Sequence, residues 1–171
     1  MCSIKTIILK FIDPNQFGYV ANSNTTCLLI KLHDYVTKAL EHSNVDSVAI
    51  VTFDFFNAFD TISHDILLRQ LTSLNFPVCD IQLIYSYVTN RRQRVRYKCN
   101  YSTICSISSG VPQGSILGPF LFILYIADLL PLDPTTFYAK YADDLTLAIP
   151  IRKQKKSMTQ LKIFKKSVLT L

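Results

Sequence analysis

The sequence predicts an α+β fold in which helices pack on one face of an antiparallel sheet. Val48–Phe53 is a near-continuous apolar run rich in β-branched residues, as expected for a strand that is buried on both faces. Thr136–Tyr141 and Leu145–Ile149 are two further apolar runs, and a short turn that contains adjacent aspartates separates them. Stretches with helical spacing accompany these strands, so that strand–helix and hairpin units follow one another along the chain.

Length and composition fit one globular domain, residues 1–171, because a chain of 171 residues with 49% hydrophobic content can bury a sizeable core. The net charge of +6 favours a polyanionic partner. The five cysteines show no C-x-x-C spacing, which indicates neither a zinc site nor a disulfide framework and favours a reducing compartment. Residues 1–12 lack the features of a signal peptide, and Ile116–Ala127 is too short to span a bilayer. We therefore expect an intracellular protein, nuclear or cytoplasmic, that is neither secreted nor bound to a membrane.

Four stretches have apolar residues at helical spacing and are predicted to be helices: Thr25–Glu41, Ser63–Leu74, Asp80–Val88 and Ile116–Leu130. Asn24 or Thr25 can cap the first of these helices, Ser63 can cap the second, and Pro77 ends the second helical unit. His64, at the start of the second helix, is expected to be a solvated or capping group rather than a metal ligand.

The densest basic cluster before the C-terminal tail is Arg91–Lys98, in which basic and other residues alternate. A strand with this pattern has one strongly basic face, and Tyr101–Ser108 is its expected hairpin partner. Such a face can be a charged sheet edge that prevents aggregation, or it can contact the phosphates of a nucleic acid. The phosphate contacts would come from Arg91, Arg92, Arg94, Arg96 and Lys98. The tail, Arg152–Lys166, has a second basic pattern, typical of a basic amphipathic helix.

Carboxylates stand at the ends of two predicted strands. Asp54 ends the first apolar run, and Asp143 and Asp144 lie in the turn between the other two. Two adjacent negative charges are costly unless a cation or a basic partner lies beside them, although a solvated turn is the simpler alternative. Hard oxygen ligands of this kind suit Mg²⁺, and two-metal phosphoryl-transfer sites draw carboxylates from different strands. On that hypothesis Asp54 and Asp143 lie close enough to share cations.

A third stretch, Ser109–Ser115, contains Gly110, Pro112 and Gly114, which forbid regular structure and allow the backbone to approach a ligand closely. Taken together, T-F-D-F-F-N-A-F-D (52–60), S-G-V-P-Q-G-S-I-L-G-P (109–119) and Y-A-D-D (141–144) resemble motifs A, B and C of the reverse transcriptases. The flanking segments Q-F-G-Y (16–19), S-H-D-I-L-L (63–68) and N-R-R-Q-R-V (90–95) are similar to those of non-LTR retrotransposons, jockey-like elements in particular. The resemblance covers about residue 16 to the end.

This resemblance implies a right-hand polymerase palm with an antiparallel sheet and packed helices, with partial fingers and without a thumb. It also implies RNA-directed DNA polymerase activity, in which two Mg²⁺ ions, with Mn²⁺ as a substitute, promote transfer of a dNTP to a primer 3′-hydroxyl. The implied partners are an RNA template, a DNA primer and the dNTP. The remaining finger, thumb and endonuclease regions would belong to a parent polyprotein.

The resemblance also assigns roles to individual residues. Asp54, Asp143 and Asp144 would be the catalytic carboxylates; Asp54 and Asp143 would be the main metal ligands, with Asp144 as a supporting carboxylate. The backbone carbonyl of Phe55 would add one oxygen to the metal site. Phe59 would lie beneath the incoming sugar and exclude a 2′-hydroxyl, and Gln113 and Gly114 would line the nascent base pair. The sequence departs from the family pattern at Val20, where an arginine is common, and at Phe56 and Asn57, where a small residue and a lysine are common.

Two alternatives belong to other classes. The chain can be a truncated, catalytically inactive fragment that at most binds nucleic acid. It can also be a palm enzyme of another type, such as a nucleotidyl cyclase, which uses similar carboxylates; the V-P-Q-G loop at 111–114 argues against that reading.

Overall fold

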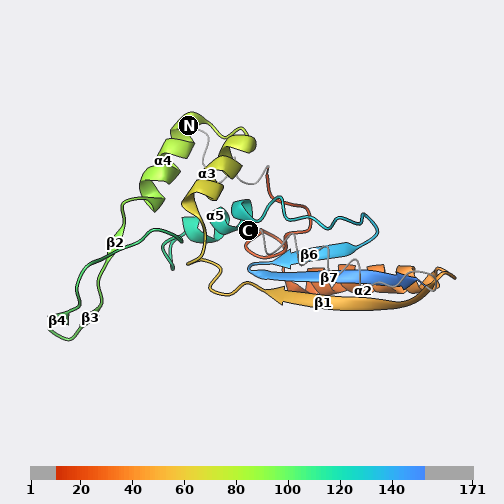
Figure 1. The fold of residues 1–171 in the computed structure, drawn as a ribbon. Helices are drawn as coiled ribbons and strands as arrows, with labels where there is room; N and C mark the ends of the chain where they lie inside the picture. The colour runs from red at the N-terminus through yellow and green to blue at the C-terminus, as the bar shows by residue number, and fades with distance from the viewer. Residues whose placement is uncertain (1–10, 153–171) are drawn as a thin grey trace. The chain divides into compact units, whose positions relative to one another are not determined.

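The computed structural model describes residues 11–152, which divide into two compact units. We call the unit formed by Asp13–Phe55 and by the chain from Ala127 onward the sheet unit, and the unit that contains Phe56–Ile126 the helical unit. Figure 1 shows the elements of both. The basic tail predicted for residues 152–166 lies almost wholly outside the described residues.

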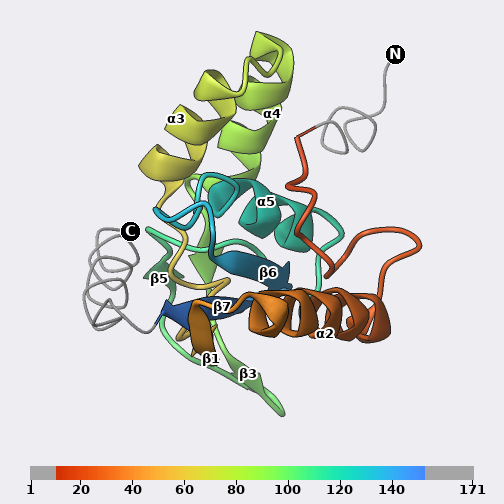
Figure 2. The same ribbon diagram turned by 90° about the vertical axis from the view of Figure 1, so that its right-hand side faces the viewer.

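The sheet unit is built on a three-stranded antiparallel sheet in the order β1-β7-β6. The strands are β1 (Val45–Asp54), β6 (Phe137–Tyr141) and β7 (Asp144–Arg152). The central strand β7 contributes Leu145, Leu147 and Ile149 to a buried cluster with Leu129. Helix α2 (Thr25–Glu41) lies along the sheet and contacts all three strands (Figure 2). The antiparallel sheet and its packed helix confirm the predicted α+β class.

Helix α2 has the predicted bounds and the predicted cap. The Asn24 side-chain oxygen accepts a hydrogen bond from the Cys27 N–H at 2.9 Å, which satisfies one of the free donors at the helix start. Its buried residue Leu28 packs with Phe17 and Ala139, whereas Leu29 and Ile30 on the outer face are exposed.

Strand β1 includes the predicted Val48–Phe53, but the prediction that it is buried on both faces is wrong. Within the described chain β1 pairs only with β7, and each of its residues is half-buried or exposed, with Ile50 54% exposed. An apolar β-branched run looks the same whether one face of the strand or both faces are covered, because the sequence does not show which elements pack on the sheet.

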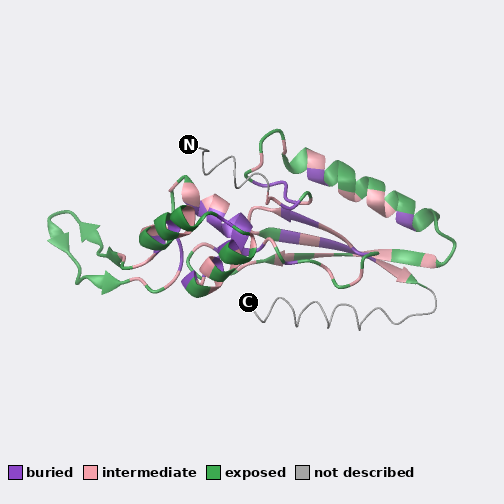
Figure 3. Cartoon of the chain, turned by 90° about the horizontal axis from the view of Figure 1, so that it is seen from above, coloured by how far each residue is buried: buried purple, intermediate pink, exposed green. Residues whose placement is uncertain are grey.

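The helical unit contains α3 (His64–Ser73), α4 (Val78–Val88) and α5 (Leu117–Tyr125). Helix α3 contacts both α4 and α5, and the three helices bury Leu71, Ile84 and Leu121 between them. Figure 3 shows the buried residues of these helices in purple. Ser63 caps α3 as predicted, through a 3.5 Å hydrogen bond from the Ile66 N–H.

Helix α5 is shorter than the predicted Ile116–Leu130. The helix ends at Tyr125, and Leu129 belongs instead to the buried cluster of the sheet unit. The apolar run therefore serves two cores, and hydrophobic pattern alone could not divide it between them.

The predicted hairpin after α4 is present as two short antiparallel ladders. β2 (Arg92–Gln93) pairs with β5 (Cys105–Ser106), and β3 (Arg96–Tyr97) pairs with β4 (Asn100–Tyr101). All of these strand residues are exposed, as the green colour of this hairpin in Figure 3 shows. None of the helices within residues 11–152 is long and apolar enough to cross a membrane.

Candidate active site

The Y-A-D-D stretch forms the predicted strand–turn–strand. Tyr141, the last residue of β6, pairs with Asp144, the first residue of β7, which leaves Ala142 and Asp143 as a two-residue turn. Ala142 has a φ of 56°, a region that residues other than glycine rarely occupy. The tight turn places Asp143 at its tip and Asp144 at the start of the central strand.

The register of the sheet brings the upstream carboxylate to the same place. Asp54 ends β1 and lies directly opposite Asp144 of β7. Side chains that oppose each other in this way lie on one face of the sheet, with Cβ atoms about 5 Å apart. The register thus brings Asp54 to the same end of the sheet as the neighbouring pair Asp143 and Asp144, although Asp54 is far from that pair in sequence.

The carboxylates influence one another electrostatically. The pKa of Asp144 is raised, first by partial burial and then by the negative charges of Asp143 and Asp54. Charges of like sign that are held together favour the binding of a cation, because a cation relieves their repulsion.

The groups at this end of the sheet include several possible ligands for a divalent cation. The three carboxylates supply the hard oxygens that Mg²⁺ prefers, and the Phe55 carbonyl follows Asp54 directly in the chain. As their side chains stand, no three His, Cys, Asp or Glu residues between positions 11 and 152 are arranged to hold a metal ion together. The donor chemistry and the backbone register fit a divalent cation, and binding it requires these exposed or half-buried side chains to turn toward it.

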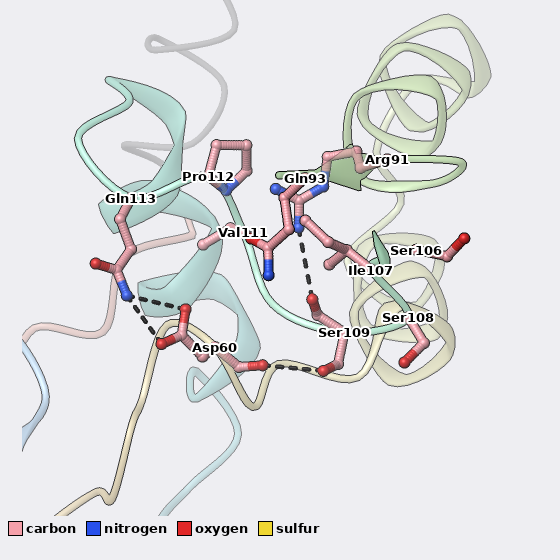
Figure 4. A pocket seen from close by; sticks show the side chains of 10 residues that line it. All are labelled: Asp60, Arg91, Gln93, Ser106, Ile107, Ser108, Ser109, Val111, Pro112 and Gln113. Carbon is pink, nitrogen blue, oxygen red and sulfur yellow. Dashed lines mark hydrogen bonds between the residues drawn. The ribbon is translucent and has the colours of Figure 1, made fainter. Parts of the chain in front are cut away.

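The helical unit carries the other predicted site residues. The Gln113 amide donates hydrogen bonds to both carboxylate oxygens of Asp60, each at 2.9 Å, and Figure 4 shows the two side chains directed toward one another. Phe59 packs against Phe122, with ring centroids 5.2 Å apart. Gly114 has a φ of 74°, and a Cβ built on it would meet no atom within 4 Å. Glycine at position 114 is therefore favoured by the backbone conformation and not by close neighbouring atoms.

A cavity of about 600 Å³ lies beside these groups in the helical unit. Figure 4 shows the ten side chains that line it: Asp60, Arg91, Gln93, Ser106, Ile107, Ser108, Ser109, Val111, Pro112 and Gln113. Most of them are polar, so the cavity suits a polar ligand.

The loop Ser109–Ser115 is held by contacts that sequence reasoning missed. The carbonyl of Gly110 accepts hydrogen bonds from His64 Nε2 at 2.8 Å and from Arg91 Nη2 at 2.7 Å. His64 is buried, so the expectation of a solvated or capping group is wrong for this histidine. The N-R-R run indicates only positive charge. The binding of its first arginine to backbone carbonyls could not be predicted locally, because the loop that supplies the Gly110 carbonyl lies 19 residues further on.

Gly110 itself is required by a close approach. It has a φ of 77°, and a Cβ on it would lie 2.7 Å from Asp60 Cα and 2.8 Å from the Phe59 carbonyl oxygen. Its N–H donates to the Ile62 carbonyl at 2.8 Å. The motif B loop is therefore fixed against the segment that carries Phe59 and Asp60.

Basic side chains of the exposed hairpin lie over tyrosine rings. The Arg94 guanidinium lies 4.1 Å from the centroid of the Tyr101 ring, and that of Arg96 lies 5.7 Å from the same centroid. The Lys98 ammonium lies 5.5 Å from the centroid of the Tyr97 ring. Arg91 differs from these residues, because its guanidinium is half-buried and donates to carbonyls of the chain.

Comparison with known proteins agrees with these observations. Residues 2–170 match the family model described as reverse transcriptase (RNA-dependent DNA polymerase), and the chain belongs to this family. It is 32% identical over 145 residues to a probable RNA-directed DNA polymerase from transposon BS of Drosophila melanogaster, covering 81% of this chain and 16% of that protein. It is 33% identical to the RNA-directed DNA polymerase from mobile element jockey of the same species, covering 80% of this chain and 15% of that protein. These relatives confirm the predicted resemblance to non-LTR elements.

Solved structures support the fold at a coarser level. A telomerase from Candida Tropicalis in complex with a fragment of telomeric RNA superposes with a TM-score of 0.69 at 14% identity, covering 92% of this chain and 29% of that one. An apo telomerase from the same organism, truncated from its C-terminal domain, gives 0.65 at 14% identity, with 88% and 32% covered. The chain thus has a polymerase palm-like fold and spans less than a fifth of the curated relatives it matches.

Two glycines in the motif B loop provide a test of the close approach. Both have positive φ, so alanine at either position costs about 1–2 kcal/mol for the backbone conformation alone. Gly114→Ala is expected to cost no more than that, whereas Gly110→Ala also forces backbone atoms apart and should cost about 3 kcal/mol or more. Urea unfolding of the two variants measures the difference. Equal losses of stability would show that Gly110 is not packed against Asp60.

Proposed function

We propose that this chain is the palm part of a reverse transcriptase of a non-LTR mobile element, which transfers deoxynucleotides to a primer 3′-hydroxyl on an RNA template. The observation that carries the proposal is the register that opposes Asp54 to Asp144, with Asp143 in the adjoining turn. Membership in the reverse transcriptase family supports the same reaction.

In this mechanism Asp54 and Asp143 would hold two divalent cations, and Asp144 and the Phe55 carbonyl would supply supporting oxygens. When bound, Mg²⁺ or Mn²⁺ lowers the pKa of the primer hydroxyl and neutralises the charge that develops on the α-phosphate. The paired sheet fixes the backbone positions that carry the carboxylates, so that only their side chains have to turn toward a cation.

The helical unit contributes nucleotide selection. The Phe59 ring, supported by Phe122, presents a flat apolar surface to the sugar and clashes with a 2′-hydroxyl. Gln113, held by Asp60, lines the nascent base pair together with Gly114. The hairpin with Arg92, Arg94, Arg96 and Lys98 contacts template–primer phosphates, and Arg91 holds the loop behind it.

The first test concerns the carboxylates. A chimera in which this chain replaces the matching segment of the Drosophila melanogaster jockey polymerase is assayed for extension of oligo(dT) on poly(rA) with Mg²⁺. Asp143→Asn is expected to lower the extension rate at least about a hundredfold, because a cation loses a charged ligand. Asp46→Asn is the matched control, since Asp46 is an exposed aspartate near the other end of β1.

Three outcomes separate the candidate functions. Loss in Asp143→Asn with activity retained in Asp46→Asn supports the proposed reaction. Extension that does not depend on Asp143 would refute the assigned carboxylates. A chimera that is folded and binds template–primer but extends nothing would favour the inactive nucleic-acid-binding fragment.

The second test concerns sugar choice. In the same chimera, Phe59→Ala should raise the incorporation of ribonucleotides relative to deoxynucleotides, because the ring that meets the 2′-hydroxyl is removed. Single-nucleotide primer extension with each nucleotide measures the ratio. Leu71→Ala, at a buried position in α3, controls for a general loosening of the helical unit. An unchanged ratio in an active Phe59→Ala enzyme would assign Phe59 to the core alone.

The third test concerns the hairpin. Arg94→Ala and Arg96→Ala should each weaken binding of a template–primer duplex and reduce the slope of log K against log salt by nearly one, because each lost phosphate contact releases fewer counterions. Lys38→Ala removes one positive charge from the exposed side of α2 and should leave the slope unchanged. A salt titration of binding by fluorescence anisotropy measures the slope. Equal effects of all three substitutions would indicate a contribution from net charge only.

A further inference from the structure

The segment Asp13–Gly18, which precedes α2, lies beside the strand that leads into the Asp143–Asp144 turn. The Lys140 N–H donates to the Asn15 carbonyl at 2.8 Å, and the Phe17 N–H donates to the Lys140 carbonyl at 2.7 Å. These two bonds make a parallel bridge between Gln16 and Lys140 at the outer edge of β6. The segment thus pairs with β6 close to the point where the turn begins.

A buried ion pair fixes the same strand. Lys140 Nζ lies 2.8 Å from Asp13 Oδ2, and the two side chains are only 1% and 5% exposed. The Tyr138 hydroxyl and the Asn15 N–H both donate to the other oxygen of Asp13, at 3.1 and 2.8 Å. Because a buried charge that loses its partner is strongly unfavourable, this pair permits one position of β6 relative to the segment.

Gly18 touches the turn itself. A Cβ built on Gly18 would lie 2.1 Å from the Ala142 nitrogen and 2.9 Å from both Ala142 Cα and the Tyr141 carbonyl carbon. Only a residue without a side chain allows the two backbones to approach this closely. The contact falls on Ala142, whose positive φ persists only where the surroundings determine it.

The segment is in turn anchored away from the turn. Phe17 is buried with Leu28 of α2 and Ala139 of β6, and the buried Gln16 side chain donates to the Gly18 carbonyl at 3.1 Å. Gly18 is therefore held from both sides and acts as a fixed surface rather than as a mobile loop.

We infer that Asp13–Gly18 positions the Asp143–Asp144 turn, with Gly18 and Asp13 as positioning residues for the cation-binding carboxylates. This inference rests on the proposed function for its chemical consequence. The backbone of the turn determines where the two aspartates project, and Gly18 determines where that backbone lies. Groups that orient metal ligands without touching the metal typically change metal affinity or activity 10- to 100-fold when they are altered.

Two measurements on the purified chain test the inference. Hydrogen exchange of the Tyr141 and Asp144 amides, the pair that closes the turn, reports the turn, and electron paramagnetic resonance of free Mn²⁺ reports cation affinity. Gly18→Ala is expected to speed exchange at the turn and to weaken Mn²⁺ binding about 10-fold or more, while Asp54→Asn weakens Mn²⁺ binding without affecting the segment. Ala21→Ser, which adds one atom at an exposed position just beyond Gly18, should change neither.

Asp13→Asn keeps the size of the side chain and adds no atom, so it decides the question if Gly18→Ala does not fold. It should also speed exchange at the turn and weaken Mn²⁺ binding, and Asp46→Asn is its control. A folded variant at either position with wild-type exchange at Tyr141 and Asp144 would overturn the positioning role. If the wild-type chain binds no Mn²⁺, the proposed metal chemistry fails, and the exchange data alone still decide whether the segment positions the turn.

Discussion

The antiparallel register between β1 and β7 is the constraint on which the candidate site depends. In a strand, side chains alternate between faces, so a slip of one residue would move every side chain of β1 to the other face. The same register that opposes Asp54 to Asp144 also opposes Phe53 to Leu145 and Val51 to Leu147. Leu145 and Leu147 are almost fully buried in a cluster that includes Phe53, so a slip would expose this cluster. Hydrophobic burial thus maintains a register whose chemical result is a set of opposed carboxylates.

Repulsion between the carboxylates destabilises the strand pairing that brings them together. Partial burial, followed by the negative charges of Asp143 and Asp54, raises the pKa of Asp144, and folding at neutral pH brings Asp54 close to a pair of charges from which it is distant in the unfolded chain. The apolar residues that follow Asp144 along β7 and precede Asp54 along β1 supply compensating contacts. A short hairpin with strained φ at Ala142 survives next to that core because the core and the Asp13–Gly18 segment determine its position from both sides.

Sequence reasoning succeeded where the signal is local. Asn24 and Ser63 cap helices because a short polar side chain can reach an N–H two or three residues ahead, and that chemistry depends on nothing distant. The turn at Ala142–Asp143 follows from two adjacent aspartates between apolar runs in the same way. The three motifs that resemble a reverse transcriptase are also local signals, because each is a short continuous run and their order along the chain can be recognised without the fold.

Sequence reasoning failed where a residue depends on a partner far along the chain. The pairing of Asp13 with Lys140, and the hydrogen bonds of His64 and Arg91 to Gly110, join segments whose proximity only the fold creates. Local position predicted a basic surface for Arg91 and a solvated or capping group for His64, because Arg91 lies in a basic cluster and His64 lies at a helix start. The incomplete burial of β1 and the early end of α5 have the same cause, since both depend on which elements pack against a strand or an apolar run.

In both units a glycine brings two backbones together at a functional segment. In the sheet unit Gly18 lies against the turn that carries Asp143, and in the helical unit Gly110 lies against the backbone of Phe59 and Asp60. Side chains held only by other side chains retain several rotamers, whereas a backbone in contact with another backbone has little freedom. Gly114, in contrast, faces open space and keeps its left-handed conformation without any such contact. The chain therefore uses close backbone contacts to position the segments that bear Asp143, Asp144 and Phe59, whereas Gln113 and Gly114, proposed to line the base pair, are exposed to solvent.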